Sequence, residues 1–526
     1  MKDLRRRQFL FIAVLSYVLF SSNIGGVDLY PYDEARNAGC AWEMMITDEW
    51  LIPSFNGDLR FHKPPLHYYP MIIGYKVFGY GPFGARLFSS ICGVFTVLLL
   101  YLFASKYFDP DVALFSALAL LGSIHFALQV HMAVPDPYLI LLLTAALLLL
   151  YHSIQIRSAP LTILSYAILG LASLTKGPVA IAIGILAVFY FMIFSRNFSW
   201  PFIKKLKLHF GLPVLMAVTI PWYYYIGKVT SGEYTEGFFL VHNLQRFSAP
   251  MEGHGGSFLV TWLFILVGML PFSVYIIQSF AQVWREKAVN PVLTFIFSCG
   301  LAVITIFTLS QTRLPNYTVP AYPFVALILA YYISTIVKKD RLPFHFKLST
   351  IVFLIFSIAG PVGAFFAFQN DPSLSDLKHL ALYLLPLSLG GILSVIFVLK
   401  NDGRRSVISQ VASTMIVTML FFYIVYPKFD AVNPTKVLSP MIEKDADVWA
   451  YKLYNPAFVI SLERIIPPLH EEEDLKLILE KSSDGYLITR KNYMEELSKY
   501  PQLEFKGSHK DLFELSTSVV YKINSD

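Results

Sequence analysis

Long runs of apolar residues, separated by short polar segments, dominate the pattern along this chain. A helix needs about 20 such residues to cross a bilayer. The gaps hold Pro, Gly and charged residues, as turns between spans do. The pattern therefore predicts an all-α polytopic membrane protein with about thirteen transmembrane helices. We expect them near 9–25, 86–105, 112–132, 137–155, 160–174, 178–195, 210–227, 257–280, 291–309, 318–337, 348–368, 379–399 and 406–426.

The pattern changes in a long first loop and in the C-terminal tail. The loop, 26–85, is rich in aromatic residues, and Ala35–Ile46 has the spacing of a helix with an apolar face, typical of a membrane interface. In the tail, Phe458–Leu462 and Tyr486–Thr489 resemble strands, and Glu471–Lys481 and Asn492–Lys499 resemble helices. We therefore expect a transmembrane domain over 1–426 and a small soluble α/β domain over 427–526.

Composition supports this division. Of the 526 residues, 55% are hydrophobic and only 15% are charged, whereas soluble domains carry about 25% charged residues. The net charge of +6 belongs to the membrane part, since the tail has more acidic than basic residues. This basic excess indicates membrane orientation and contact with lipid phosphate, not a nucleic-acid partner. The three cysteines show no disulfide framework and no zinc spacing.

The distribution of Lys and Arg predicts the orientation. Segments on the side of the N-terminus hold 19 basic residues, and those on the other side hold ten before the tail. Basic loops stay in the cytoplasm, so the N-terminus is expected there. With an odd number of spans, the tail is expected in the periplasm. No small-residue cleavage site precedes Tyr30, so the first helix is expected to be retained.

Charged residues from separate parts of the chain are predicted to meet on the outer side. Ionisable groups beside a membrane are costly, and they usually pair or mark a functional pathway. Their convergence predicts a site for an anionic, lipid-linked ligand. The residues concerned are Asp33, Lys63, Asp136, Lys176, His242, Arg246, His254 and Arg313.

Each residue also has a purely structural interpretation. The pair Asp33-Glu34 suits a general base or a metal ligand, or an acidic first turn of a helix. Lys63, before two prolines, suits phosphate as a point charge, or reaches from the membrane to water. Asp136 and Lys176 stand in tight turns between spans, where Asp is common for its local hydrogen bonds.

The later loops offer further ligands for phosphate or metal. Arg246 suits a bidentate contact with phosphate. His242 and His254 are candidate metal ligands or ordinary loop residues. Arg313 and Tyr317 lie on one rigid turn, where a guanidinium and a phenol suit phosphate oxygens or anchor a helix end.

Several motifs together resemble the bacterial lipid-linked-sugar transferases, above all the lipid A 4-amino-4-deoxy-L-arabinose transferases and their protein O-mannosyltransferase relatives. Pro31-Tyr32-Asp33-Glu34-Ala35-Arg36 resembles their Asp-Glu-x-Arg signature. The other blocks, in the same order as in that family, are Asn56-Gly57, His62-Lys63-Pro64-Pro65-Leu66, Lys176-Gly177-Pro178, Gln245-Arg246-Phe247 and Arg313-Leu314-Pro315-Asn316-Tyr317.

The resemblance implies a GT-C fold and a sugar donor linked to undecaprenyl phosphate, with no nucleotide cofactor. It implies Asp33 as catalytic carboxylate, with Asp136 as a second acid and Glu34 beside Asp33. The donor phosphate would be held by Lys63, Arg246, Arg313 and Tyr317, with Lys176 and Arg36 as further cations. The family often has Glu before Lys-Pro-Pro, where this chain has His62. His62 therefore either replaces that Glu in a divalent-metal site, with His242 and His254, or the metal site is absent.

The predicted function is glycosyl transfer to lipid A, or another envelope glycolipid, at the periplasmic face of the bacterial inner membrane. Membrane lipids are the other expected partners. Two alternatives remain from the sequence: a protein O-glycosyltransferase with the same class of donor, and a transporter or flippase for a lipid-linked sugar. A transporter is expected to contain paired, interrupted helices near the membrane centre.

Overall fold

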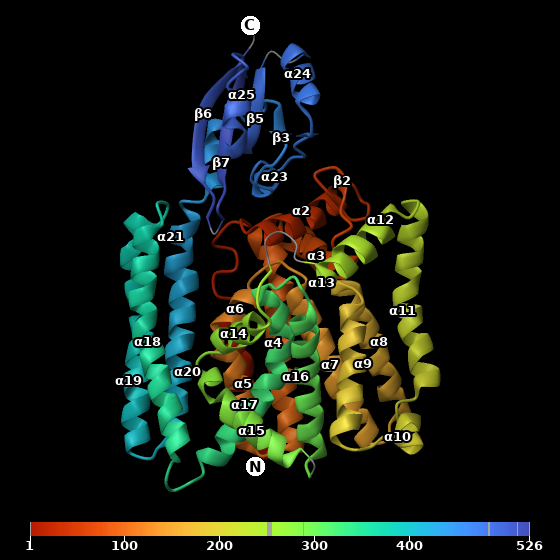
Figure 1. Cartoon of the computed structure of the whole chain (residues 1–526), viewed down its shortest axis with the longest axis vertical. Coiled ribbons are helices and arrows are strands. Elements are labelled where there is room, and N and C mark those ends of the chain that lie inside the picture. Colours follow the sequence, from red (N-terminus) through yellow and green to blue (C-terminus); the bar gives the residue numbers. More distant parts are fainter. Residues whose placement is uncertain (1, 250–254, 288, 482–483, 513, 525–526) are drawn as a thin grey trace.

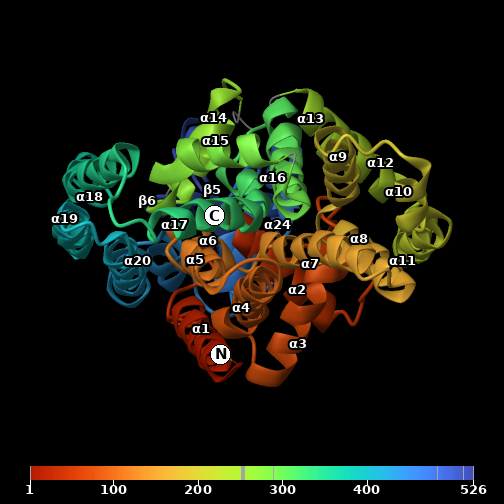
Figure 2. The same ribbon diagram turned by 90° about the horizontal axis from the view of Figure 1, so that it is seen from below.

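The computed structural model describes residues 2–249, 255–287, 289–481, 484–512 and 514–524. A bundle of long helices forms its lower part, and a small mixed sheet stands at the end remote from the N-terminus (Figure 1). Viewed along the bundle from the N-terminal end, α18–α20 group at one side and α8–α11 at the opposite side (Figure 2). The chain is a multi-pass membrane protein.

Each predicted span corresponds to a helix or a bent pair of helices. These are α1 (Lys2–Phe20), α4 (Pro82–Tyr107), α5 (Pro110–Leu121) with α6 (Ile124–Val130), α7 (Asp136–Gln155), α8 (Ala159–Lys176), α9 (Val179–Phe194), α11 (Leu208–Val229), α14 (Leu259–Gly268) with α15 (Ile276–Glu286), α16 (Pro291–Leu309), α17 (Tyr322–Ile336), α18 (Phe344–Asn370), α19 (Leu385–Leu399) and α20 (Gly403–Leu420).

Fewer helices than the thirteen expected spans are both long and apolar enough to cross a membrane by themselves. Within the described residues, nine helices are long and apolar enough to cross a membrane, or eleven if each bent pair forms one span. The difference lies in α1 and α9. The first turns of α1 are strongly charged, and α9 has only 16 residues.

Two bent pairs interrupt the bundle. The first bends by 67° between α5 and α6, and the second by 120° after α14. Ser123 caps α6 by accepting a hydrogen bond from the Phe126 amide. Its hydroxyl also donates to the carbonyl of Gly268 at the end of α14, at 2.7 Å. The two interruptions therefore contact each other.

The first loop folds into short elements beside the sheet. They are α2 (Tyr32–Ile46), the hairpin β1 (Ser54–Phe55) and β2 (Asp58–Leu59), and α3 (Tyr68–Phe78). The expected helix over Ala35–Ile46 is thus confirmed as part of α2. Asn56 and Gly57 turn the hairpin with φ of 59° and 83°, the left-handed pair that a two-residue turn needs.

The tail forms a five-stranded sheet in the order β4-β3-β5-β7-β6. β3 pairs in parallel with β4 and β5, and β7 pairs antiparallel with β5 and β6. The elements are β3 (Val448–Tyr451), α23 (Ala457–Ser461), β4 (Pro468–Leu469), α24 (Glu472–Lys481), β5 (Asp484–Arg490), α25 (Met494–Leu497), β6 (Leu503–Lys510) and β7 (Thr517–Asn524). The small α/β tail is confirmed, and the domain boundary at residue 427 stays a prediction.

One predicted strand is wrong. Phe458–Leu462 is rich in β-forming residues, but it lies mostly in α23, which begins after Pro456. Its side chains are divided between two partners: Phe458 and Val459 pack in the core of the sheet, and Ile460 packs against α2. In a strand, Phe458 and Ile460 would share one face and Val459 would lie on the other, which does not match this division of contacts.

The first loop and the tail are joined by hydrogen bonds. The Asn56 side chain accepts from the Ile466 amide and donates to its carbonyl, both at 2.6 Å, and it donates to the Tyr454 hydroxyl. The Gly57 amide donates to Glu43 on α2. The Asn-Gly turn therefore fixes the loop between α2 and the sheet.

Candidate active site

A cavity of about 770 Å³ lies between the first loop and the end of the helix bundle that carries the sheet. Its walls come from α2, the segment before α3, α6, and the chain around Arg246, Tyr317 and Tyr426. Seven of the predicted site residues line it. They are Asp33, Glu34, Arg36, His62, Lys63, Arg246 and Tyr317.

The adjacent carboxylates Asp33 and Glu34 have different surroundings. Both lie in the first turn of α2, but consecutive residues of a helix point about 100° apart. Glu34 is fully buried and forms a paired ion contact with Arg86 of α4, 2.7 Å for each oxygen. It also accepts from the Ala133 amide. This geometry gives Glu34 a positioning role and leaves Asp33 as the carboxylate that faces the cations.

Positive charges determine the ionisation of Asp33. Burial alone would raise the pKa of this carboxyl, but Lys63 and Arg60, with further cations behind them, hold it below its usual range. Asp33 is therefore a carboxylate at neutral pH. Burial also lowers the pKa of Lys63, to about 8, against the opposing effect of Asp33. Lys63 is mostly charged at pH 7 and loses its charge as the pH rises through 8.

A smaller cavity of about 100 Å³ continues from the first. Both are lined by His62, Lys63, Arg246 and Tyr317, and Lys176 lines only the smaller one. The Lys176 ammonium lies 2.6 Å from Asp136 and 5.0 Å from the centre of the Tyr317 ring. Three cations and a phenol thus surround a space of the size of a phosphate group.

Asp136 stands behind Lys176. Its carboxylate is 1% exposed; one oxygen accepts from Lys176 and the other from the Asn316 amide, at 3.4 Å. It lines neither cavity among the described residues. The geometry gives Asp136 a role in holding Lys176, whereas the sequence resemblance made it a second acid.

Arg313 is directed elsewhere. Its guanidinium donates to the backbone carbonyls of Gly256 and Thr308, and it is absent from the described lining of both cavities. Its predicted role on the donor phosphate has no support in this geometry. Tyr317, from the same predicted block, does line both cavities.

The predicted metal ligands do not form a metal site within the described residues. The rings of His62 and His242 lie 4.0 Å apart, centre to centre, and no group of three metal-binding side chains occurs in the described part of the chain. His254 lies outside the described residues. The pKa of His62 is lowered to about 2, mainly by burial and next by Arg60 and other nearby cations. The cations beside this pair of histidines would repel a divalent ion.

The tail reaches the cavity through a cluster of polar residues. The Tyr32 hydroxyl, beside Asp33, donates to Asp511 at 2.5 Å and accepts from Arg490. Arg490 and Asp511 form a buried ion pair. Glu514, on the turn between β6 and β7, lines the cavity itself. The sheet therefore forms part of the cavity wall and holds the start of α2.

The chain is similar in sequence to a protein-family model and to several other proteins. Residues 62–225 match the family model of dolichyl-phosphate-mannose-protein mannosyltransferases. The chain is 29% identical over 348 residues, 64% of its length, to an undecaprenyl phosphate-alpha-4-amino-4-deoxy-L-arabinose arabinosyl transferase of Pseudomonas aeruginosa. It is 29% identical over 330 residues, 62% of its length, to an uncharacterized protein of Aquifex aeolicus. The matches span 61% and 64% of those relatives.

Comparison with a solved structure establishes the fold. ArnT from Cupriavidus metallidurans, bound to undecaprenyl phosphate, superposes with a TM-score of 0.81 and 18% identity, over 98% of this chain and 97% of that one. This chain has the ArnT fold. Together with the sequence matches, it confirms the expected resemblance to the lipid-linked-sugar transferases. An Archaeoglobus fulgidus oligosaccharyltransferase is less similar, with a TM-score of 0.54 and 13% identity over 95% and 73% of the two chains.

The structure also places in the site two residues that the sequence did not single out. Arg60 is buried against the Tyr68 hydroxyl and the Asn37 amide oxygen, and it lines the cavity. Arg86 binds Glu34. A signal for each was present in the sequence: Arg60 precedes Lys63 by three residues, and Arg86 is a charge in the first turns of a span, where charges are costly.

Proposed function

We propose that this protein is a glycosyltransferase that takes a sugar from a polyprenyl-phosphate donor. One observation supports this most strongly. A cavity holding an ionised carboxylate, Asp33, opens into a phosphate-sized space lined by Lys63, Lys176, Arg246 and Tyr317. The first can accept a sugar and an acceptor hydroxyl, and the second can accept the phosphate of the donor.

In this proposal, the sugar and the acceptor react in the larger cavity and the donor phosphate lies in the smaller one. An acceptor oxygen attacks the anomeric carbon of the sugar from the face opposite the phosphate. The bond from that carbon to the phosphate oxygen breaks, and its electron pair leaves with the polyprenyl phosphate. Fixed cations stabilise this developing charge in a site with little water. The acceptor proton passes to Asp33, and the product is expected to have inverted configuration.

The more specific proposal is transfer of 4-amino-4-deoxy-L-arabinose to lipid A. It rests on the name of the Pseudomonas aeruginosa relative and on the acceptor space beside Asp33. The site would face the periplasm of the bacterial inner membrane, with the N-terminus cytoplasmic, as the distribution of basic residues predicts. A protein hydroxyl in the same position would make the enzyme a protein O-glycosyltransferase.

A transporter of lipid-linked sugars is the second candidate. The contact between the two interrupted helix pairs favours it, because transporters often form sites at broken helices. The position of the charged residues favours the enzyme, since they gather at one end of the bundle beside the sheet.

The test compares wild type with Asp33→Asn in reconstituted membranes that contain a radiolabelled polyprenyl-phosphate sugar and lipid A. We expect wild type to move label to lipid A, and Asp33→Asn to be slower by a factor of about 10² or more, the usual contribution of a general base. Asp58→Asn, an exposed aspartate on β2, is the matched control. Label that crosses the bilayer on its original carrier would establish the transporter instead.

A further inference from the structure

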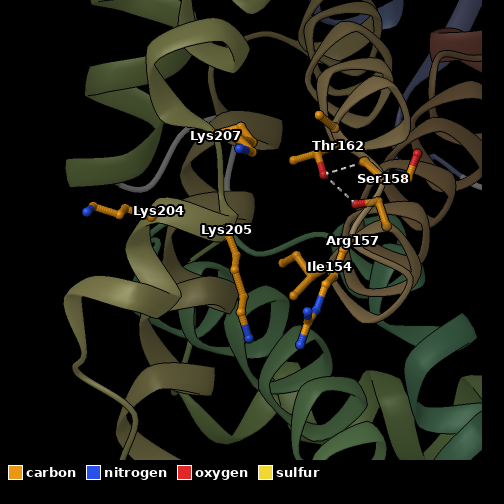
Figure 3. A pocket seen from close by; sticks show the side chains of 9 residues that line it. Ile154, Arg157, Ser158, Thr162, Lys204, Lys205 and Lys207 are labelled. Atoms are coloured by element: carbon orange, nitrogen blue, oxygen red, sulfur yellow. Dashed lines mark hydrogen bonds between the residues drawn. The ribbon is translucent and has the colours of Figure 1, made fainter.

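A second group of cations lies at the opposite end of the bundle from Asp33. Arg157 follows α7, Lys204 and Lys205 end α10 (Trp200–Lys205), and Lys207 precedes α11. They line a cavity of about 330 Å³ together with Ser153, Ile154, Ser158, Ala159 and Thr162 (Figure 3). The described lining of this cavity contains no Asp or Glu.

Two of these cations converge. Figure 3 shows the side chains of Arg157 and Lys205 extending toward the same space, whereas Lys204 points away from it. The hydroxyls of Ser153 and Thr162 bond to each other at 2.9 Å and to backbone carbonyls. No anionic group on the described lining balances the converging charges, which is the arrangement of a site for an anion.

A second cavity, with both polar and apolar lining residues, continues from the basic one. It has a volume of about 350 Å³ and shares Ile154, Arg157 and Lys205 with the first. Lys287 adds another cation to it. Its apolar lining residues include Leu150, Val188, Phe191, Phe202, Leu206 and Phe295, and its polar ones include Gln155, Ser195, Asn197 and Thr294. A site with cations at its rim and apolar side chains beside them is complementary to an amphipathic anion.

Exposed aromatic residues locate this site relative to the bilayer. Trp200 and Phe198, just before or within α10, are 65% and 61% exposed, and Trp284 on α15 is 54% exposed. Trp is enriched where the hydrocarbon meets the headgroups. The two cavities therefore lie at headgroup depth, where lipid phosphates are concentrated.

We propose that these cavities bind an anionic phospholipid of the surrounding bilayer, with its phosphate between Arg157 and Lys205. The guanidinium can bind two phosphate oxygens at once, and the ammonium acts as a point charge. The apolar lining residues would contact the first carbons of an acyl chain. A general excess of basic residues at this face would explain the sign of the charge, but not its convergence in a cavity that continues into a second one lined partly by apolar side chains. The inference is independent of glycosyl transfer.

The experiment is native mass spectrometry of the purified full-length protein titrated with phosphatidylglycerol. The principal variant is Arg157→Gln with Lys205→Gln. Each basic residue near an anionic lipid contributes about a fivefold factor in affinity, so we expect the double variant to bind about 25-fold more weakly. Lys339→Gln with Arg341→Gln removes the same charge from exposed residues at the same end, and it should bind as wild type does.

Three results would overturn the proposal. Equal losses in the two double variants would mean that only the overall charge of this face matters. Unchanged binding in the Arg157/Lys205 variant would place the lipid elsewhere. Competition by inorganic phosphate, or stronger binding of undecaprenyl phosphate than of phosphatidylglycerol, would assign the site to that ligand.

Lys205→Gln alone, an exposed change at the end of α10, serves if the double variant does not fold. This single variant should bind phosphatidylglycerol about fivefold more weakly than wild type.

Discussion

The pKa of Lys63 gives the sharpest test of the proposed site. The ammonium is expected to bind the donor phosphate, and burial brings its pKa to about 8. It would be about 90% charged at pH 7, half charged at pH 8 and about 10% charged at pH 9. If only the charged form binds the donor, kcat/KM should fall about fivefold between pH 8 and pH 9.

Asp33 should not limit the rate on the acidic side of this range. Its pKa is held below the ordinary value of 3.8, so the carboxylate is already ionised at pH 6. The profile of kcat/KM from pH 6 to pH 10 should therefore be flat at first and then fall with a single alkaline pKa near 8. The profile of kcat should fall at higher pH, since bound phosphate stabilises the ammonium.

Substitution by arginine separates Lys63 from other groups. Arginine keeps its charge from pH 6 to pH 10, so Lys63→Arg should lose the alkaline decline, although its rate at pH 7 will be lower because its geometry differs. Lys228→Arg, at an exposed lysine of α11, should retain the decline. An unchanged decline near pH 8 in Lys63→Arg would refute the reasoning, because another group would then be titrating.

Three further substitutions test the structure around the site. Arg86→Ala should lower the free energy of unfolding by about 3–5 kcal/mol, because it leaves a buried carboxylate without its partner. In the same thermal-unfolding measurement, the exposed Arg404→Ala should lower it by less than about 1 kcal/mol. Gly74→Ala should lower the free energy of unfolding by about 1–3 kcal/mol, since the new Cβ would lie 2.0 Å from a backbone oxygen of α4. The Cβ of Gly363→Ala meets open space, so this control should melt as wild type does. Tyr32→Phe should cost about 1–3 kcal/mol and speed hydrogen exchange in β7, and exchange as slow as in wild type would contradict its role in holding the tail.

The helices were predictable because a single property specifies them. A run of apolar residues long enough to cross a bilayer has few alternatives to a helix, since lipid cannot satisfy backbone polar groups. The tail was harder to predict. Its short strands gain their stability from partners that are distant in sequence. The β-forming residues of Phe458–Leu462 pack against two different surfaces, the sheet core and α2.

The site was predictable as a set of residues but not as a set of roles. The outer charges could be counted from the sequence, and seven of the twelve predicted site residues line one cavity. Which of Asp33 and Glu34 faces the cations depends on a rotation of about 100° between consecutive helix residues. The partner of Glu34, Arg86, lies on another helix. Likewise, Asp136 could be assigned to Lys176 only once α7 and α8 were placed side by side.

The hydrogen bonds of Asn56 have a consequence for biosynthesis. Its partner Ile466 lies 410 residues later in the chain, so the hairpin beside Lys63 cannot make these contacts until nearly the whole protein has been translated and its tail has reached the same side of the membrane. A nascent chain that ends between α20 and Ile466 would hold every span but lack the residue that fixes its first loop. Assembly of the first loop therefore waits for translation of the tail as far as Ile466.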